Sequence, residues 1–143
     1  MKSIDRIKLF PLTGLALGVT LEGTGAATAK IYPNGRIYIN VTTTLENSKT
    51  LTLTTPYSLR VLDVKTIHGD GTASSLVLKN GSTAITSTIV AAASDKDVDG
   101  VRVATAGTIY DAQYEFIEGD DDMVFLVSVA AAFCDIVIDT VFI

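Results

Sequence analysis

The strongest constraint on the fold is a two-residue alternation of apolar and polar side chains that recurs along the chain. It is clearest over residues 37–45, where isoleucine and valine alternate with tyrosine, asparagine and threonine. Successive side chains of a β-strand point to opposite faces of the sheet, so this period predicts a strand with one buried face. Threonine, valine and isoleucine are abundant, and β-branched side chains favour strands over helices. An all-β chain is therefore predicted.

Two turn signals place hairpins in this pattern. Pro33, Asn34 and Gly35 separate one apolar run from the strand that begins at Ile37, and Asn80-Gly81 separates two more. Proline fixes φ, and Asn-Gly tolerates the positive φ that tight hairpin turns require. We expect hairpins at Pro33-Gly35 and at Asn80-Gly81.

Further strands are predicted over residues 50–54, 59–67, 101–103, 123–129 and 134–143. The nearly continuous apolar run at 123–129 predicts a strand buried on both faces. In 134–143 one face is apolar and the other mixes aspartate with valine. Short helices are expected only around 89–93 and 110–116, because no longer window holds a helical period. Eight to ten short strands without alternating helices predict a β-sandwich, or jelly-roll-like, fold.

The length of 143 residues predicts a single domain over 1–143, with residues 1–14 as an N-terminal arm. Hydrophobic residues make up 48% of the chain and charged residues 19%, so few charges are left to coat the surface. We therefore expect part of the surface to be covered by a partner. In the arm, Ile7, Leu9 and Phe10 are the side chains predicted to reach that partner.

The N-terminus also imitates a secretory signal peptide. Basic residues precede an apolar run, and Ala27-Thr28-Ala29 has the small-residue pattern of a cleavage site. Asp5 and the interruptions at Pro11 and Gly18 weaken this interpretation. The alternative is a strand over residues 15–21 with its leucines and Val19 on one face.

The net charge of −5 argues against nucleic acid as a partner, because the 11 basic residues are scattered rather than clustered. No polybasic run lies beside an apolar segment, so no membrane partner is expected. Cys134 is the only cysteine, which excludes an intrachain disulfide and a cysteine-based metal site. No cofactor is expected.

Asp95, Asp97 and Asp99 followed by Gly100 have the spacing that opens a calcium-binding loop. The pattern fails where Ala106 stands in place of the bidentate glutamate, so the three aspartates are weak metal candidates and a polar connection is the main interpretation. A second acidic cluster, residues 118–122, is expected to be a solvated hairpin turn.

Nothing in the sequence predicts a catalytic site. His68 is the only histidine, and Asp70 could orient it, but no nucleophile motif accompanies them and a loop histidine is expected. Cys134 lies within a strand pattern. Aromatic residues are 7% of the chain with no tryptophan, which argues against a platform for stacking sugars or bases. We predict a protein that is not an enzyme.

Residues 59–143 resemble the small decoration, or cement, proteins of tailed double-stranded DNA bacteriophages. The resembling segments are residues 76–86 (LVLKNGSTAIT), 91–97 (AAASDKD) and 108–112 (TIYDA), followed by an apolar strand. The resemblance implies a virion structural protein, a homotrimer on the capsid surface that binds the major capsid protein and stabilises the head. The acidic residues 118–122 depart from the plainer glycine-rich hairpin expected in such proteins.

A different function class stays open beside this one. It is a secreted or surface-exposed β-sandwich module whose acidic loops hold calcium and recognise a glycan or a protein. Cleavage after Ala29 and calcium dependence would favour the module, whereas an intact Met1 and a stable trimer would favour the capsid protein.

Overall fold

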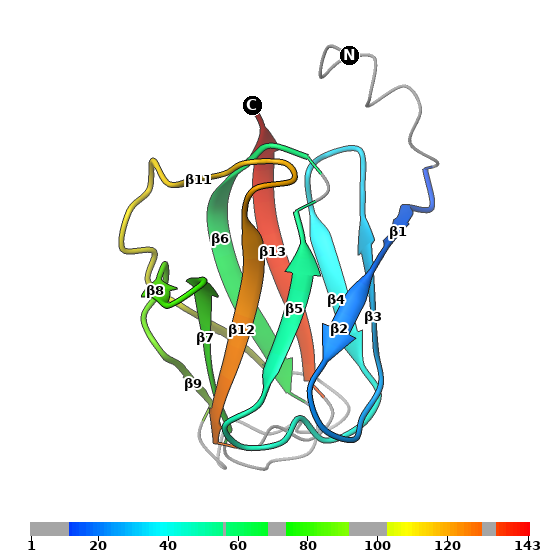
Figure 1. Ribbon diagram of the computed structural model, residues 1–143, viewed down its shortest axis with the longest axis vertical. Helices are drawn as coiled ribbons and strands as arrows, with labels where there is room; N and C mark the ends of the chain where they lie inside the picture. Colours follow the sequence, from blue (N-terminus) through cyan, green and yellow to red (C-terminus); the bar gives the residue numbers. More distant parts are fainter. Residues whose placement is uncertain (1–11, 56, 69–73, 92–102, 130–133) are drawn as a thin grey trace.

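The computed structural model describes residues 12–55, 57–68, 74–91, 103–129 and 134–143. Within these ranges the chain forms thirteen strands and no helix. The strands build two antiparallel sheets that pack face to face, with β12 and β5 in front of β13 and β4 in Figure 1. The predicted β-sandwich is confirmed.

Sheet A holds seven strands. In spatial order they are β1 (Leu15–Leu17), β3 (Ala27–Ile31), β4 (Ile37–Val41), β13 (Cys134–Phe142), β6 (Leu59–His68) and β10 (Val103–Ala106), with β11 (Glu115–Phe116) also paired to β6. The C-terminal strand therefore lies in the middle of the sheet, between the first hairpin and β6.

Sheet B holds six strands. Their order is β2 (Val19–Leu21), β5 (Thr50–Thr54), β12 (Asp122–Val129), β7 (Ser74–Asn80) and β8 (Thr83–Ala84), with β9 (Ile89–Ala91) also paired to β7. Because β1 belongs to sheet A and β2 to sheet B, the chain passes between the sheets at Gly18.

The core lies between the sheets and is aliphatic with two buried phenylalanines, Phe116 and Phe125. The alternation identified its inward side chains correctly. Ile136 and Ile138 of β13 are fully buried between the sheets, and Leu15 and Leu21 pack against the same core from opposite sheets. The apolar face expected over residues 15–21 is thus confirmed, although the segment forms two strands.

Both predicted hairpins are present. Gly35 (φ 88°) and Gly81 (φ 57°) adopt the positive φ that their turns require. In the first turn the Asn34 side-chain oxygen accepts a hydrogen bond from the Arg36 backbone N–H at 3.0 Å. This contact is an Asx turn, which explains why asparagine suits that corner.

Three predictions are wrong in detail. Residues 89–91 form strand β9, because Ile89 is buried opposite Leu76, and residues 110–116 form turns and strand β11 rather than a helix. The histidine is not in a loop, since His68 is the last residue of β6. Strand β12 buries one face within the sandwich, where Phe125 points into the core, whereas Leu126 on the outer face is half-buried, so burial of the second face by another subunit stays a prediction.

Candidate functional site

A groove runs over the outer face of sheet A above β3 and β4. It consists of two adjoining hollows of about 530 Å³ and about 300 Å³ that share two tyrosines. We call it the tyrosine groove, and its side chains are Leu12, Thr28, Lys30, Tyr32, Pro33, Asn34, Arg36, Tyr38 and Asn40.

The hairpin register explains why these side chains meet. Ile31 pairs with Ile37 and both point into the core, so the alternate pair Lys30 and Tyr38 points outward. One period further along, Thr28 pairs with Asn40. The same alternation that builds the core therefore gathers polar and aromatic side chains on the outer face.

A buried carboxylate next to the groove orients two of its side chains. Asp135 on β13 is only 1% exposed although it faces outward from the sandwich. It accepts a hydrogen bond from the Tyr38 hydroxyl and another, at 2.8 Å, from the Asn40 amide nitrogen. A buried charge needs such partners, so this triad fixes the positions of Tyr38 and Asn40.

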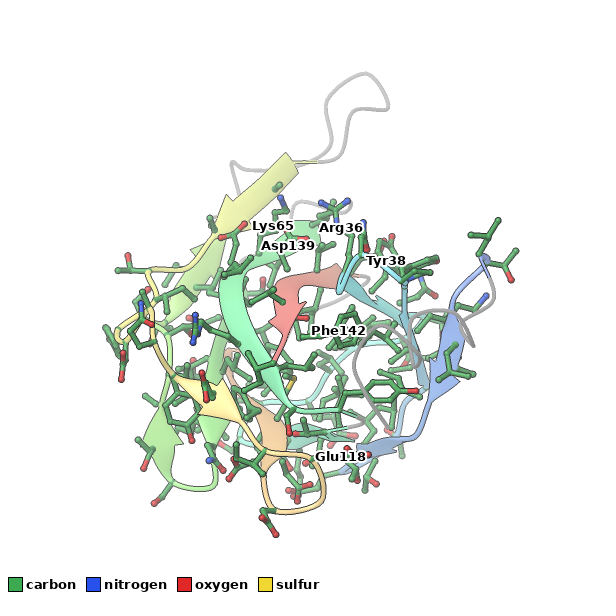
Figure 2. The ribbon with its side chains drawn as sticks, turned by 90° about the horizontal axis from the view of Figure 1, so that it is seen from above. Arg36, Tyr38, Lys65, Glu118, Asp139 and Phe142 are labelled. Atoms are coloured by element: carbon green, nitrogen blue, oxygen red, sulfur yellow. The ribbon has the colours of Figure 1, made fainter. Side chains whose placement is uncertain are left out.

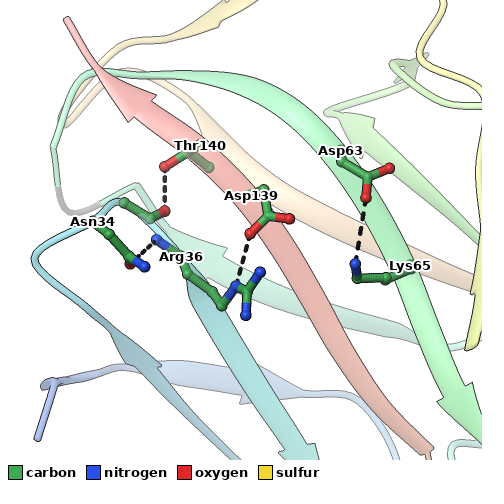
Figure 3. A network of polar contacts seen from close by, with 7 residues as sticks. Asn34, Arg36, Asp63, Lys65, Asp139 and Thr140 are labelled. Atoms are coloured by element: carbon green, nitrogen blue, oxygen red, sulfur yellow. Dashed lines mark hydrogen bonds and ion pairs between the residues drawn. The ribbon is translucent and has the colours of Figure 1, made fainter.

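A second carboxylate holds the turn end of the groove. Arg36 Nε donates to Asp139 Oδ1 at 2.8 Å, and this contact raises the pKa of Arg36 above its ordinary value. The Thr140 hydroxyl donates to the Gly35 carbonyl, so the hairpin tip is tied to β13 (Figure 3). Figure 2 shows Arg36, Tyr38 and Asp139 along one side of the molecule.

The other wall of the groove is built by Tyr32 and Lys30. Gly14 has φ 91°, and a Cβ added there would lie 3.0 Å from Tyr32 Cε1, so the ring packs closely against this glycine. Lys30 is exposed and makes no ion pair with any described residue. The groove thus has one free ammonium group beside two partly exposed aromatic rings.

The outer face of sheet B has a different character. Its outward side chains across β2, β5, β12 and β7 pair as Thr20 with Thr52, Thr52 with Val124, and Leu126 with Val77. The charged side chains nearest to this area are Lys79, which pairs with Val124, and Glu22, whose carboxylate accepts a hydrogen bond from the Thr50 hydroxyl. We call it the neutral face: Thr20, Thr50, Thr52, Val77, Val124 and Leu126.

A smaller apolar cluster ends the outer face of sheet A. Val141 pairs with Arg60, which pairs in turn with Glu115, and Arg60 Nη2 donates to Glu115 Oε1 at 2.6 Å. Around this ion pair stand Leu62, 56% exposed, and Ile143, 42% exposed. Among the described strands, exposed aliphatic side chains thus gather on β6 and at the C-terminal end of β13, near β11.

Most sequence-predicted candidates fall outside the described residues. Asp95, Asp97 and Asp99 do so, as does the arm with Ile7, Leu9 and Phe10. The described part of the chain contains no group of three or more side chains suited to hold a metal ion. It contains no helix long and apolar enough to cross a membrane.

The acidic turn at 118–122 proves partly structural. Asp121 accepts hydrogen bonds from the Asn80 side chain at 2.9 Å and from the Ile117 backbone N–H at 2.7 Å. Glu118 and Asp120 are exposed, as expected for a solvated turn. One of the four carboxylates therefore organises the loop.

The strand register places His68 opposite Cys134, a pairing that the sequence did not suggest. Asp70, the carboxylate considered as its orienting partner, lies outside the described residues. The tyrosine groove was also missed, since a low aromatic content argued against any stacking surface. The sequence did contain one indication of it: Tyr32 and Tyr38 stand on either side of the predicted turn, and residues that flank a hairpin turn lie close together.

Comparison with known proteins assigns the chain to no family. No family model matches the chain, and no curated protein matches it. Among solved structures, the chain is similar to that of CsCBM6-3 from Clostridium stercorarium in complex with cellobiose. The two are 15% identical with a TM-score of 0.42, and the match covers 88% of this chain and 92% of the other.

Proposed function

We propose that this protein is a non-catalytic structural subunit of a bacteriophage virion, a capsid decoration protein that binds the major capsid protein as a homotrimer. The neutral face of sheet B carries the proposal. Interface centres are depleted in charge, and this surface of threonine, valine and leucine can be covered without desolvating a charged group of its own. The resemblance of residues 59–143 to cement proteins adds to this observation.

A second observation favours the neutral face as the surface that a protein partner covers. Val77 is 8% exposed, and its pairing partner Leu126 is half-buried, as is Val124. Covering it with a partner removes the remaining apolar area from water without breaking an ion pair. Covering the outer face of sheet A would instead desolvate three ion pairs between described residues.

The test is attachment of the purified protein to phage heads that lack it and carry the cognate capsid protein. We expect saturable binding with fixed stoichiometry, and a trimer by light scattering. Thr52→Lys places a charge at the centre of the neutral face and should lower affinity for heads at least about tenfold. Leu62→Lys, an equivalent change on sheet A, is the matched control.

Loss of attachment in Leu62→Lys with full attachment in Thr52→Lys would move the docking surface to sheet A. A monomer that does not bind heads would refute the capsid function. Deleting residues 1–10 should weaken attachment if the arm reaches a neighbour, and unchanged occupancy would remove the arm from the proposal.

The second candidate function is a secreted or surface-exposed binding module, and the tyrosine groove is the observation that favours it. Calcium dependence is its separate test. Heat on calcium titration that Asp97→Ala abolishes would support a calcium-assisted module, and an absence of heat would restrict the module to the groove.

A further inference from the structure

We propose that the tyrosine groove binds an acidic oligosaccharide, a sugar chain that carries carboxylate groups. This inference goes beyond capsid attachment and uses the opposite face of the sandwich. It therefore fails or succeeds independently of the neutral face.

The size and the lining of the groove fit a short oligosaccharide. Its two hollows, of about 530 Å³ and about 300 Å³, lie within or at the edge of the range of small-ligand sites. Tyr32 and Tyr38 offer amphipathic rings that can cover the apolar face of a sugar. The Asn34 and Asn40 amides add planar hydrogen-bonding groups suited to hydroxyls.

The charge of the lining selects a ligand with carboxylates. Of the described residues, Lys30 and Arg36 both line the groove and no carboxylate does, although the whole chain has a net charge of −5. The two nearby aspartates are already engaged: Asp135 by Tyr38 and Asn40, and Asp139 by Arg36 Nε. The remaining guanidinium N–H groups of Arg36 and the Lys30 ammonium group are donors suited to a carboxylate.

The site is also held in place before a ligand arrives. Asp135 fixes Tyr38 and Asn40, and the tie between Thr140 and Gly35 fixes the turn that bears Asn34. Side chains fixed in the free protein lose little conformational entropy on binding, which favours a built site over an accidental hollow.

The same geometry disfavours a peptide. Strand β3 pairs with both β1 and β4, and β4 pairs with both β3 and β13, so no free strand edge lies in the groove. An extended peptide could not add a strand there. A helical ligand would require a continuous apolar groove, whereas polar side chains, among them Lys30, Arg36 and Asn40, interrupt this lining.

The experiment screens the full-length protein against immobilised oligosaccharides that contain uronic or sialic acid, together with neutral oligosaccharides of equal length. Hits are measured by calorimetry in solution. We expect acidic sugars to bind, neutral ones to bind at least about tenfold more weakly, and added salt to reduce the difference. Poly-glutamate is the probe for charge alone.

Variants locate the site. Lys30→Gln and Tyr32→Ala should each weaken binding about tenfold, with folding checked by circular dichroism. Lys65→Gln removes a cation of the same outer face that lies outside the groove, and Tyr110→Ala removes a tyrosine that is 63% exposed elsewhere. Both controls should bind normally.

Three results would overturn the proposal. They are no binding to any acidic sugar in the panel, equal binding of acidic and neutral sugars, and binding of poly-glutamate as tight as that of the best sugar. Loss of binding in the controls as large as in the groove variants would likewise place the site elsewhere.

Discussion

The two sheets present similar inner faces and very different outer faces. Inside, both contribute alternate aliphatic side chains to one core. Outside, sheet A carries three ion pairs between described residues, the buried carboxylate of Asp135 and a groove, whereas the neutral face of sheet B carries threonine and aliphatic residues. The inner faces build the shared core, whereas the outer faces differ and are the surfaces available to partners.

This difference separates the two binding proposals in space. A neutral face is suited to a large protein partner, and a charged, hollowed face is suited to a small polar ligand. A subunit attached through sheet B would leave the groove of sheet A open to solvent. The stability predictions below test how differently the two sheets respond to equivalent changes.

The largest difference in lost unfolding free energy is expected between alanine substitutions at the two hairpin glycines. In sheet A, a Cβ added at Gly35 would lie 2.3 Å from the Thr140 carbonyl oxygen, so Gly35→Ala should cost about 3 kcal/mol of unfolding free energy. In sheet B, Gly81 has open space around it, and Gly81→Ala should cost about 1 kcal/mol from its positive φ alone. Urea denaturation measures both. Equal costs would show that the first hairpin is not tied to β13.

The next largest difference in unfolding free energy is expected between substitutions of outward-facing side chains in the middle of each sheet. Asp135→Ala removes the acceptor of two hydrogen bonds at a buried position and should cost about 2 kcal/mol. Val124→Ala on the neutral face should cost about 1 kcal/mol or less, because that side chain is half-buried. Asp135→Asn keeps one acceptor oxygen and should recover part of the loss. A smaller cost for Asp135→Ala than for Val124→Ala would contradict the structural role of the carboxylate.

The smallest effect concerns the loops that join the sheets. Glu46, between β4 and β5, accepts hydrogen bonds at 2.7 Å from the backbone N–H and the hydroxyl of Thr24, between β2 and β3. These bonds lower the pKa of Glu46 below its ordinary value. Their stabilisation is therefore present above the ordinary pKa and is lost as the pH falls through the lowered one.

Thermal unfolding at a series of pH values tests this contact. Glu46→Gln should lower the melting temperature slightly at neutral pH, and the difference from the native protein should vanish in acid. Asp120→Asn changes an exposed aspartate of the acidic turn and is the control: its melting temperature relative to the native protein should not show this dependence on pH. If the melting temperatures of Glu46→Gln and the native protein differ by the same amount at every pH, the contact between Glu46 and Thr24 does not stabilise the fold.

The sequence predicted those features that depend on neighbours along the chain. Asn-Gly specified both turns because few other residues tolerate positive φ there. The two-residue period separated inward from outward side chains in β13, where Ile136 and Ile138 are buried between the sheets. The predicted helices were wrong for residues 89–91 and 110–116, since short apolar segments are helical or extended according to the strands that they meet.

The candidate site could be predicted only in part. Lys30 and Tyr38 are neighbours across a two-strand hairpin, and the turn at Asn34 and Gly35 suffices to place them together. The partners that fix the groove are remote: Tyr38 and Asp135 are separated by 97 positions, and Arg36 and Asp139 by 103. No local pattern connects them, because β13 could have paired with any free edge.

By itself, the sequence determined an acidic all-β chain, its two Asn-Gly turns and the inward face of its strands, because these follow from side-chain periodicity and backbone sterics. Only the tertiary structure decided which outward side chains became neighbours. Strand order made one outer face neutral and the other charged and hollowed, since pairing β13 between β4 and β6 brings carboxylates from the end of the chain beside the first hairpin.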